Sequence, residues 1–151
     1  MSQLTDGVAP TFSMPGDAEQ PATGQELAGG AAVRVLVAED NALSQKVVER
    51  MLRSFGCEVD LVATGADAVE AVENQPYQLI LMDIRMPVMD GVEATHAIRH
   101  HLSQERQPLI YALTAGVSAQ ERQRCLDVGM NGFLAKPVER TEIAALIESL
   151  R

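Results

Sequence analysis

The spacing of apolar residues changes repeatedly between residues 33 and 150, and this change predicts alternating strands and helices. Short apolar or β-branched-rich runs predict strands, and a continuous run predicts one covered on both faces. Apolar positions three or four residues apart predict amphipathic helices. Strands are expected over 33–37, 58–62, 79–82, 109–113 and 133–135. Helices are expected after Asn41, after Thr64, over 92–102, over 118–127 and around 143–150.

Polar residues and glycines mark the ends of these elements. Asn41 is placed to cap the first helix and Gly56 to end it, and Thr64 with Asp67 resembles a second cap. Pro76 closes the second helix, and Asp90-Gly91 predicts a turn before the third. In the first helix the apolar positions that follow the 3.6-residue period and predict a buried stripe are Leu43, Val47, Val48, Met51, Leu52 and Phe55.

Five strand–helix units in strict alternation predict a parallel sheet with helices on both faces. Parallel neighbours need crossover connections, and these are right-handed. The sequence therefore predicts an α/β domain over residues 33–151, doubly wound, with three layers. Residues 1–32 are rich in Pro and Gly, show no apolar period, and are expected to form a disordered acidic tail or linker.

The charge balance limits the classes of partner. The chain has 151 residues with 12 Lys+Arg against 21 Asp+Glu, a net charge of −9, which argues against nucleic-acid binding. Residues 1–32 lack both a basic start and a long apolar stretch, so we expect no signal peptide, no membrane contact and a cytoplasmic location. Cys57 and Cys125 are expected to be free thiols. Arg99, His100, His101 and Arg106 are interpreted as cations at the far end of a helix, where they suit its dipole.

Polar residues stand where four of the five strands end. Glu39 and Asp40 follow the first strand, Asp83 the third, Thr114 the fourth and Lys136 the fifth. The carboxyl ends of parallel strands share one edge of the sheet, where ligands bind. Three carboxylates repel one another unless a cation compensates, and oxygen ligands at an open site suit Mg²⁺. A metal, a lysine and a hydroxyl around Asp83 predict phosphoryl transfer with Asp83 as the nucleophile.

Four short motifs, in this order and at these spacings, resemble the receiver domain of two-component response regulators. They are Glu39-Asp40-Asn41, Met82-Asp83-Ile84-Arg85-Met86-Pro87-Val88-Met89-Asp90-Gly91, Ala112-Leu113-Thr114-Ala115 and Leu134-Ala135-Lys136-Pro137. The resemblance implies a flavodoxin-like (βα)5 fold with strand order 2-1-3-4-5 and a receiver domain over 33–151.

The resemblance also implies a role for each matching residue. Asp83 would be the phosphoacceptor, assisted by Thr114 and Lys136. Mg²⁺ would be held by Asp40, Asp83 and the backbone carbonyl of Arg85, and by Glu39 through a water. Thr114 and Phe133 would form the switch, although Phe133 lacks the hydroxyl of the frequent tyrosine. The family keeps a cis peptide at Lys136-Pro137.

The segment around Asp40 and the acidic stretch before the domain resemble the C-terminal receiver of a hybrid sensor histidine kinase, whose parent protein can be membrane-anchored. The phosphodonor would be a histidine kinase or a histidine phosphotransfer domain. The chain itself would accept and lose the phosphoryl group without a kinase core. Three alternatives stay open: a stand-alone single-domain regulator, a pseudo-receiver that only binds partners, and an aspartyl-phosphate phosphatase. The phosphatase expects Asp-x-Asp on its first strand, where this chain has Glu39-Asp40.

Overall fold

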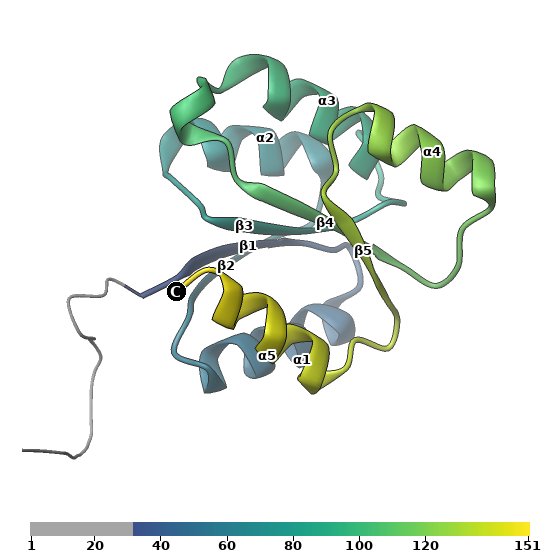
Figure 1. Ribbon diagram of the computed structural model, residues 1–151. Helices are drawn as coiled ribbons and strands as arrows, with labels where there is room; N and C mark the ends of the chain where they lie inside the picture. The colour runs from purple at the N-terminus through teal and green to yellow at the C-terminus, as the bar shows by residue number, and fades with distance from the viewer. Residues whose placement is uncertain (1–31) are drawn as a thin grey trace, which may run out of the picture. The chain divides into compact units, whose positions relative to one another are not determined.

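Strands and helices alternate along the chain in the predicted order (Figure 1). The computed structural model describes residues 32–151, so the predicted acidic tail, apart from Ala32, lies outside the described residues. The strands are β1 (Arg34–Ala38), β2 (Glu58–Val62), β3 (Leu79–Asp83), β4 (Leu109–Thr114) and β5 (Gly132–Ala135). The helices are α1 (Ala42–Ser54), α2 (Gly65–Asn74), α3 (Gly91–His101), α4 (Ala119–Asp127) and α5 (Arg140–Ser149), with a short 3₁₀ helix, η1 (Gln104–Arg106), that the sequence pattern did not indicate.

All the strands are parallel, and their order in the sheet is β2-β1-β3-β4-β5, as the resemblance implied. β3 lies at the centre, and all five of its residues are buried. Its continuous apolar run is the consequence, because a central strand of a doubly wound sheet has no solvent-facing side.

Helices cover both faces of the sheet and enclose two separate cores (Figure 1). On one face α1 and α5 contribute Val48, Leu52, Ile143 and Ile147. On the other face α2, α3 and α4 contribute buried side chains that include Val72, Ile98 and Cys125. The predicted three-layer arrangement is therefore confirmed.

The predicted caps form at α1 and α2. Asn41 Oδ1 accepts a hydrogen bond from Ser44 N at 2.9 Å, and Thr64 Oγ1 accepts one from Asp67 N at 3.1 Å. Asp90-Gly91, predicted only as a turn, begins α3: Asp90 and Glu93 form a reciprocal capping box. A Cβ at Gly91 would overlap the carbonyl oxygen of Asp83, so glycine allows α3 to start directly against the end of β3.

The predicted buried stripe of α1 is wrong at two positions. Leu43 is 74 % exposed and Val47 is 44 % exposed, whereas Val48 and Leu52 are buried. Residues 43 and 47 form one ridge of the helix, and residues 48 and 52 form another, about 100° further round. Only the second ridge meets the sheet, so the first remains an apolar surface beside the end of β1.

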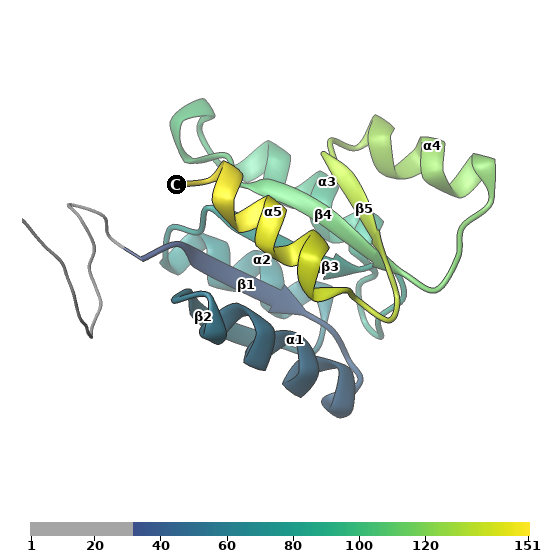
Figure 2. The ribbon, with the colours of Figure 1, turned by 60° about the horizontal axis from the view of Figure 1, so that its bottom comes forward.

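α4 is attached to the rest of the domain by little buried surface. Cys125 is its only buried residue, whereas β3 has no exposed one. Figures 1 and 2 both show α4 lying beyond the edge strand β5. The position of this helix therefore depends on contacts at its surface and at its two ends.

Candidate functional site

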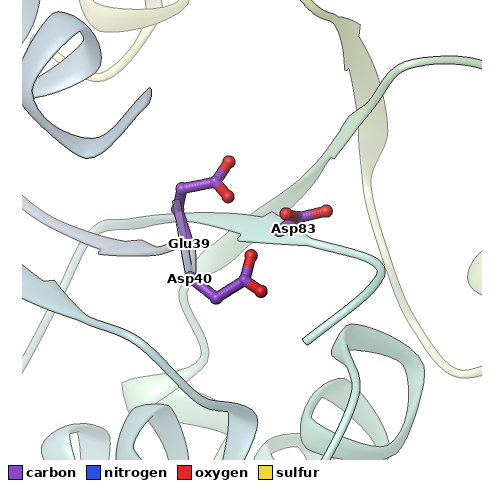
Figure 3. Close-up of side chains that lie close together, drawn as sticks. All are labelled: Glu39, Asp40 and Asp83. Carbon is purple, nitrogen blue, oxygen red and sulfur yellow. The ribbon is translucent and has the colours of Figure 1, made fainter. Parts of the chain in front are cut away.

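Three carboxylates meet at the carboxyl edge of the sheet (Figure 3). Glu39 and Asp40 follow β1 directly, and Asp83 is the last residue of β3. β1 and β3 are neighbours, with Ala38 paired to Met82, so both strands end at the same level. One carboxylate oxygen from each of the three residues lies within 4.8 Å of the others, which is the cluster expected from the sequence.

Lys136 contacts two of these acids from the end of the edge strand β5. Its Nζ lies 2.6 Å from Glu39 Oε1 and 3.0 Å from Asp83 Oδ2. The residue follows β5, two strands away from β3, and its backbone N–H donates to Thr114 O at 2.8 Å. The long side chain therefore crosses the end of β4 to reach the acids. The peptide bond between Lys136 and Pro137 is cis.

Burial and charge set the protonation of this cluster. Glu39 is 1 % exposed, and its pKa is raised by desolvation and by nearby Asp83, with Lys136 acting in the opposite direction. Desolvation alone would lower the pKa of Lys136, but its ion pairs with Glu39 and Asp83 outweigh that effect and raise it. Lys136 therefore remains a cation at neutral pH.

The donor set fits a divalent metal ion. Three carboxylates carry −3, Lys136 supplies +1, and a net −2 is left for a cation to balance. Asn41 N donates to Glu39 Oε2 at 3.0 Å, and Arg85 N donates to Asp83 Oδ1 at 3.2 Å. Glu39 Oε1 is buried and accepts no well-directed hydrogen bond despite the close ammonium of Lys136. Oxygen ligands with spare lone pairs at an acidic site match the preference of Mg²⁺.

A pocket of about 190 Å³ opens beside the carboxylates, and Asp83, Thr114 and Lys136 line it. Asp83 is 7 % exposed, so its carboxylate lies at the base of this pocket. Thr114 Oγ1 accepts a hydrogen bond from Gly116 N at 2.9 Å, so the hydroxyl is engaged with its own loop. Phe133 is partly buried on β5, and the guanidinium carbon of Arg122 lies 4.4 Å from its ring centre.

The sequence analysis did not identify Glu121 as a pocket residue, nor the contact that its side chain makes with Arg85. The wall includes Glu121 on α4 and Arg85 in the loop after β3. Arg85 Nη2 lies 3.2 Å from Glu121 Oε1 and 3.1 Å from Oε2. No local pattern could have revealed this pair, because the residues are 36 positions apart and each has an ordinary polar setting.

A family model for the response regulator receiver domain matches residues 35–148. The chain belongs to this family. The receiver domain accounts for the sheet order and for the acidic cluster at its edge.

Similar proteins agree with this assignment. The chain is 39 % identical over 118 residues to the sensor protein GacS of Pseudomonas syringae pv. syringae. This match covers 77 % of the chain and 13 % of GacS. It is 38 % identical over 120 residues to hybrid signal transduction histidine kinase L of Dictyostelium discoideum, covering 76 % of the chain and 7 % of that kinase. The chain thus spans only a small part of these relatives.

Solved receiver domains have the same fold. A receiver domain of a sensor histidine kinase from Pseudomonas aeruginosa PAO1, with a magnesium ion coordinated in its active-site cleft, is 45 % identical with a TM-score of 0.72; the match covers 79 % of this chain and 97 % of that one. The receiver domain of Ssk1 from Saccharomyces cerevisiae, co-crystallised with the histidine phosphotransfer protein Ypd1, is 31 % identical with a TM-score of 0.70. This match covers 77 % of the present chain and 86 % of the Ssk1 chain.

Proposed function

We propose that this receiver domain accepts a phosphoryl group on Asp83 from a phosphohistidine and changes conformation in response. The observation that carries the proposal is the placement of Asp83. Asp83 is 7 % exposed, and its carboxylate lies at the base of a pocket. The ammonium of Lys136 lies 3.0 Å from Asp83 Oδ2. Glu39 and Asp40 each place a carboxylate oxygen within 4.8 Å of an oxygen of Asp83, close enough for the three residues to bind one metal ion.

In the proposed transfer, one oxygen of Asp83 attacks phosphorus in line with the phosphohistidine nitrogen. The nitrogen–phosphorus bond breaks, the oxygen–phosphorus bond forms, and the histidine nitrogen keeps the electron pair and is then protonated. Lys136 offsets the negative charge on the phosphoryl oxygens. Asp83 Oδ1 is oriented by the N–H of Arg85 at 3.2 Å, which positions the carboxylate before the reaction.

Asp40, Asp83 and the backbone carbonyl of Arg85 would hold Mg²⁺, and Glu39 would contribute through a water. When bound, the ion supplies positive charge that neutralises the carboxylates and the phosphoryl oxygens. Glu39 suits an indirect role, because its carboxylate is held by Asn41 N and lies beside Lys136. Asp40 is the exposed member of the cluster, so solvent and a metal ion can reach it.

Thr114 and Phe133 would form the switch. A phosphoryl oxygen on Asp83 offers the Thr114 O–H a charged acceptor. Turning toward it would break the present bond, in which Thr114 Oγ1 accepts from Gly116 N. Movement of the Thr114 loop would change the packing around the partly buried Phe133. The phosphoryl group then shifts a two-state equilibrium by binding one state better.

The proposed donor is a histidine kinase or a histidine phosphotransfer domain. The exposed ridge of Leu43 and Val47 begins two residues after the cap of α1 and offers it an apolar contact beside Glu39 and Asp40. The pairing of the Ssk1 receiver with Ypd1 supports a donor of this kind. Within residues 32–151 no helix has the length and apolarity to cross a bilayer. A cytoplasmic setting is proposed because histidine kinases use ATP there.

The strong similarity to receiver regions of hybrid kinases supports a hybrid-kinase context over a stand-alone regulator. Sequencing the reading frame upstream of residue 1 separates the two, since a kinase core in frame is expected only in the first case.

The test of the proposed function is intact-mass spectrometry after incubation with acetyl phosphate and Mg²⁺. The parent chain is expected to gain one phosphoryl group, and Asp83→Asn is expected to gain none. Glu58→Gln, which removes an acid from the amino end of β2, serves as the matched control and should label like the parent. An unlabelled parent chain would instead favour a pseudo-receiver that only binds partners.

A further inference from the structure

The first turn of α4 is connected to the loop after Asp83 by an ion pair across the pocket wall. Arg85 Nη2 contacts both carboxylate oxygens of Glu121, at 3.1 and 3.2 Å. Glu121 is the third residue of α4, where Ser118 caps the helix by accepting from the Glu121 N–H. The pair therefore joins the beginning of a helix to a residue two positions from the phosphoacceptor.

The two partners differ in exposure. The side chain of Glu121 is 18 % exposed, while that of Arg85 is 78 % exposed. Both contacts use one guanidinium nitrogen, so the arginine can turn away without disturbing a larger hydrogen-bond network. Glu121 is the more fixed partner and Arg85 the more movable one.

A phosphoryl group in this pocket competes with Glu121 as the partner of the Arg85 guanidinium. Asp83 and Glu121 line the same pocket as Arg85, so a phosphorylated Asp83 brings up to two negative charges within reach of the guanidinium. Guanidinium pairs well with phosphoryl oxygens, and Glu121 carries a single charge. The negative phosphoryl group also repels Glu121 across the pocket.

α4 has few other attachments that would resist the loss of this pair. Cys125 is its only buried residue, and Arg122 lies over Phe133 with 4.4 Å from the guanidinium carbon to the ring centre. Glu121 and Arg122, adjacent in sequence, thus bind the first half of the helix to the loop after β3 and to β5.

We propose that Arg85 is a phosphoryl-responsive latch, which holds the start of α4 through Glu121 in the unphosphorylated domain and transfers to the phosphoryl group on Asp83. Loss of the Arg85–Glu121 pair then frees the first turn of α4. This inference rests on the proposed phosphorylation of Asp83.

Hydrogen–deuterium exchange of α4, followed by mass spectrometry with and without acetyl phosphate and Mg²⁺, tests the latch. In the parent chain, phosphorylation is expected to speed exchange in the first half of α4 by about two- to fivefold, the size of one exposed ion pair. In Glu121→Gln the exchange should already be faster by a similar factor, and phosphorylation should add little. Asp127→Asn removes the same charge from the last residue of α4 and should behave like the parent.

Substitutions at Arg85 give a second test. Arg85→Gln should match Glu121→Gln, whereas Arg85→Lys should keep most of the response, because one nitrogen makes both contacts. An equal response to phosphorylation in the parent and in Glu121→Gln would overturn the latch. Intact mass is measured on the same samples: labelled Asp83 without a latch response overturns this inference alone, and an unlabelled parent overturns both this inference and the proposed function.

Discussion

Arg99 and Arg85 bind opposite ends of α4, and they do so with different kinds of partner. Arg99 Nε and Nη2 donate to Gly129 O, just after the helix, at 3.0 and 2.8 Å. Its other hydrogen bonds reach Gln107 Oε1, Pro108 O and Asn131 Oδ1 at 2.7, 2.7 and 2.8 Å. Five hydrogen bonds match the five N–H groups of a guanidinium. Arg85, in contrast, has an exposed side chain and uses one nitrogen for both contacts with the Glu121 carboxylate.

The difference identifies one fixed and one releasable end of α4. Carbonyl and amide oxygens carry no net charge, so a new anion elsewhere does not displace them from Arg99. Burial lowers the pKa of Arg99, yet a guanidinium stays charged at any pH near neutrality. The interpretation of Arg99 as a cation at the far end of a helix is confirmed, because it lies in the last turn of α3. The sequence did not show that its side chain also holds the turn between α4 and β5.

Removing the fixed end should have the largest effect. Arg99→Ala leaves the carbonyls of Gly129 and Pro108 without their donor, and we expect the free energy of unfolding to fall by about 3 kcal/mol. Urea unfolding followed by circular dichroism measures the change. Arg124→Ala, on α4 itself, is the control and should change stability by less than about 0.5 kcal/mol. A small loss for Arg99→Ala would contradict a fixed end.

A second buried contact, before β3, should respond to high pH. The Tyr77 hydroxyl donates to Asp60 Oδ2 at 2.6 Å, and desolvation, followed by this bond and the charge of Asp60, raises the pKa of Tyr77 to about 12. Unfolded tyrosine titrates near pH 10, so the folded state retains the proton longer. This stability is fully present below pH 10 and is lost as pH rises through 12, by about 2.7 kcal/mol.

Urea unfolding of the parent and of Tyr77→Phe at pH 8, 10 and 11.5 measures this dependence. The stability difference between the two proteins should shrink as pH rises. A constant difference would mean that the Tyr77 proton does not contribute to folding stability.

The three carboxylates at the carboxyl edge of the sheet should stabilise the domain only when a cation is added. At a Mg²⁺ concentration ten times its Kd, the free energy of unfolding should rise by about 1.4 kcal/mol. Asp40→Asn removes one carboxylate of the cluster and should abolish most of this gain while raising stability slightly without Mg²⁺, since repulsion is relieved. Thermal melting with a Mg²⁺ titration checks both statements, and Asp127→Asn is the control. An equal gain in Asp40→Asn would place the ion elsewhere.

Breaking the releasable end should have the smallest effect on stability. The Arg85 side chain is 78 % exposed, so Arg85→Gln is expected to change the free energy of unfolding by no more than about 1 kcal/mol. Its effect appears instead in the exchange rate of the first half of α4. A loss comparable with that of Arg99→Ala, measured by the same urea unfolding, would remove the distinction between the two ends.

Much of the site was predictable from the sequence because it depends on strand ends. A strand has a recognisable apolar run, and the polar residue after the run marks the edge of the sheet. The sequence pattern places five residues at this edge, and the structure brings them there: Glu39, Asp40, Asp83, Thr114 and Lys136. Their spacing and identity also carried the resemblance to receiver domains, which the family model confirms.

Contacts between elements were not predictable in the same way. Leu43 and Val47 have the period of a buried face, but whether a ridge meets the sheet depends on how α1 is rotated against it. Asp90 and Gly91 have turn-forming identities, yet the need for glycine comes from the close approach of α3 to Asp83.

The sequence by itself determined the order of strands and helices along the chain, the caps of α1 and α2, and the set of acids, hydroxyl and lysine at one edge. Periodicity and capping are local properties of the chain. Only the tertiary structure decided which of the charged residues are paired, and with what. The partners of Arg85 and Arg99 lie 36 and up to 32 residues away along the chain. An arginine has the same appearance in a sequence whether it holds a backbone carbonyl or an exposed carboxylate, and its burial and its partner are fixed by the packing of separate elements.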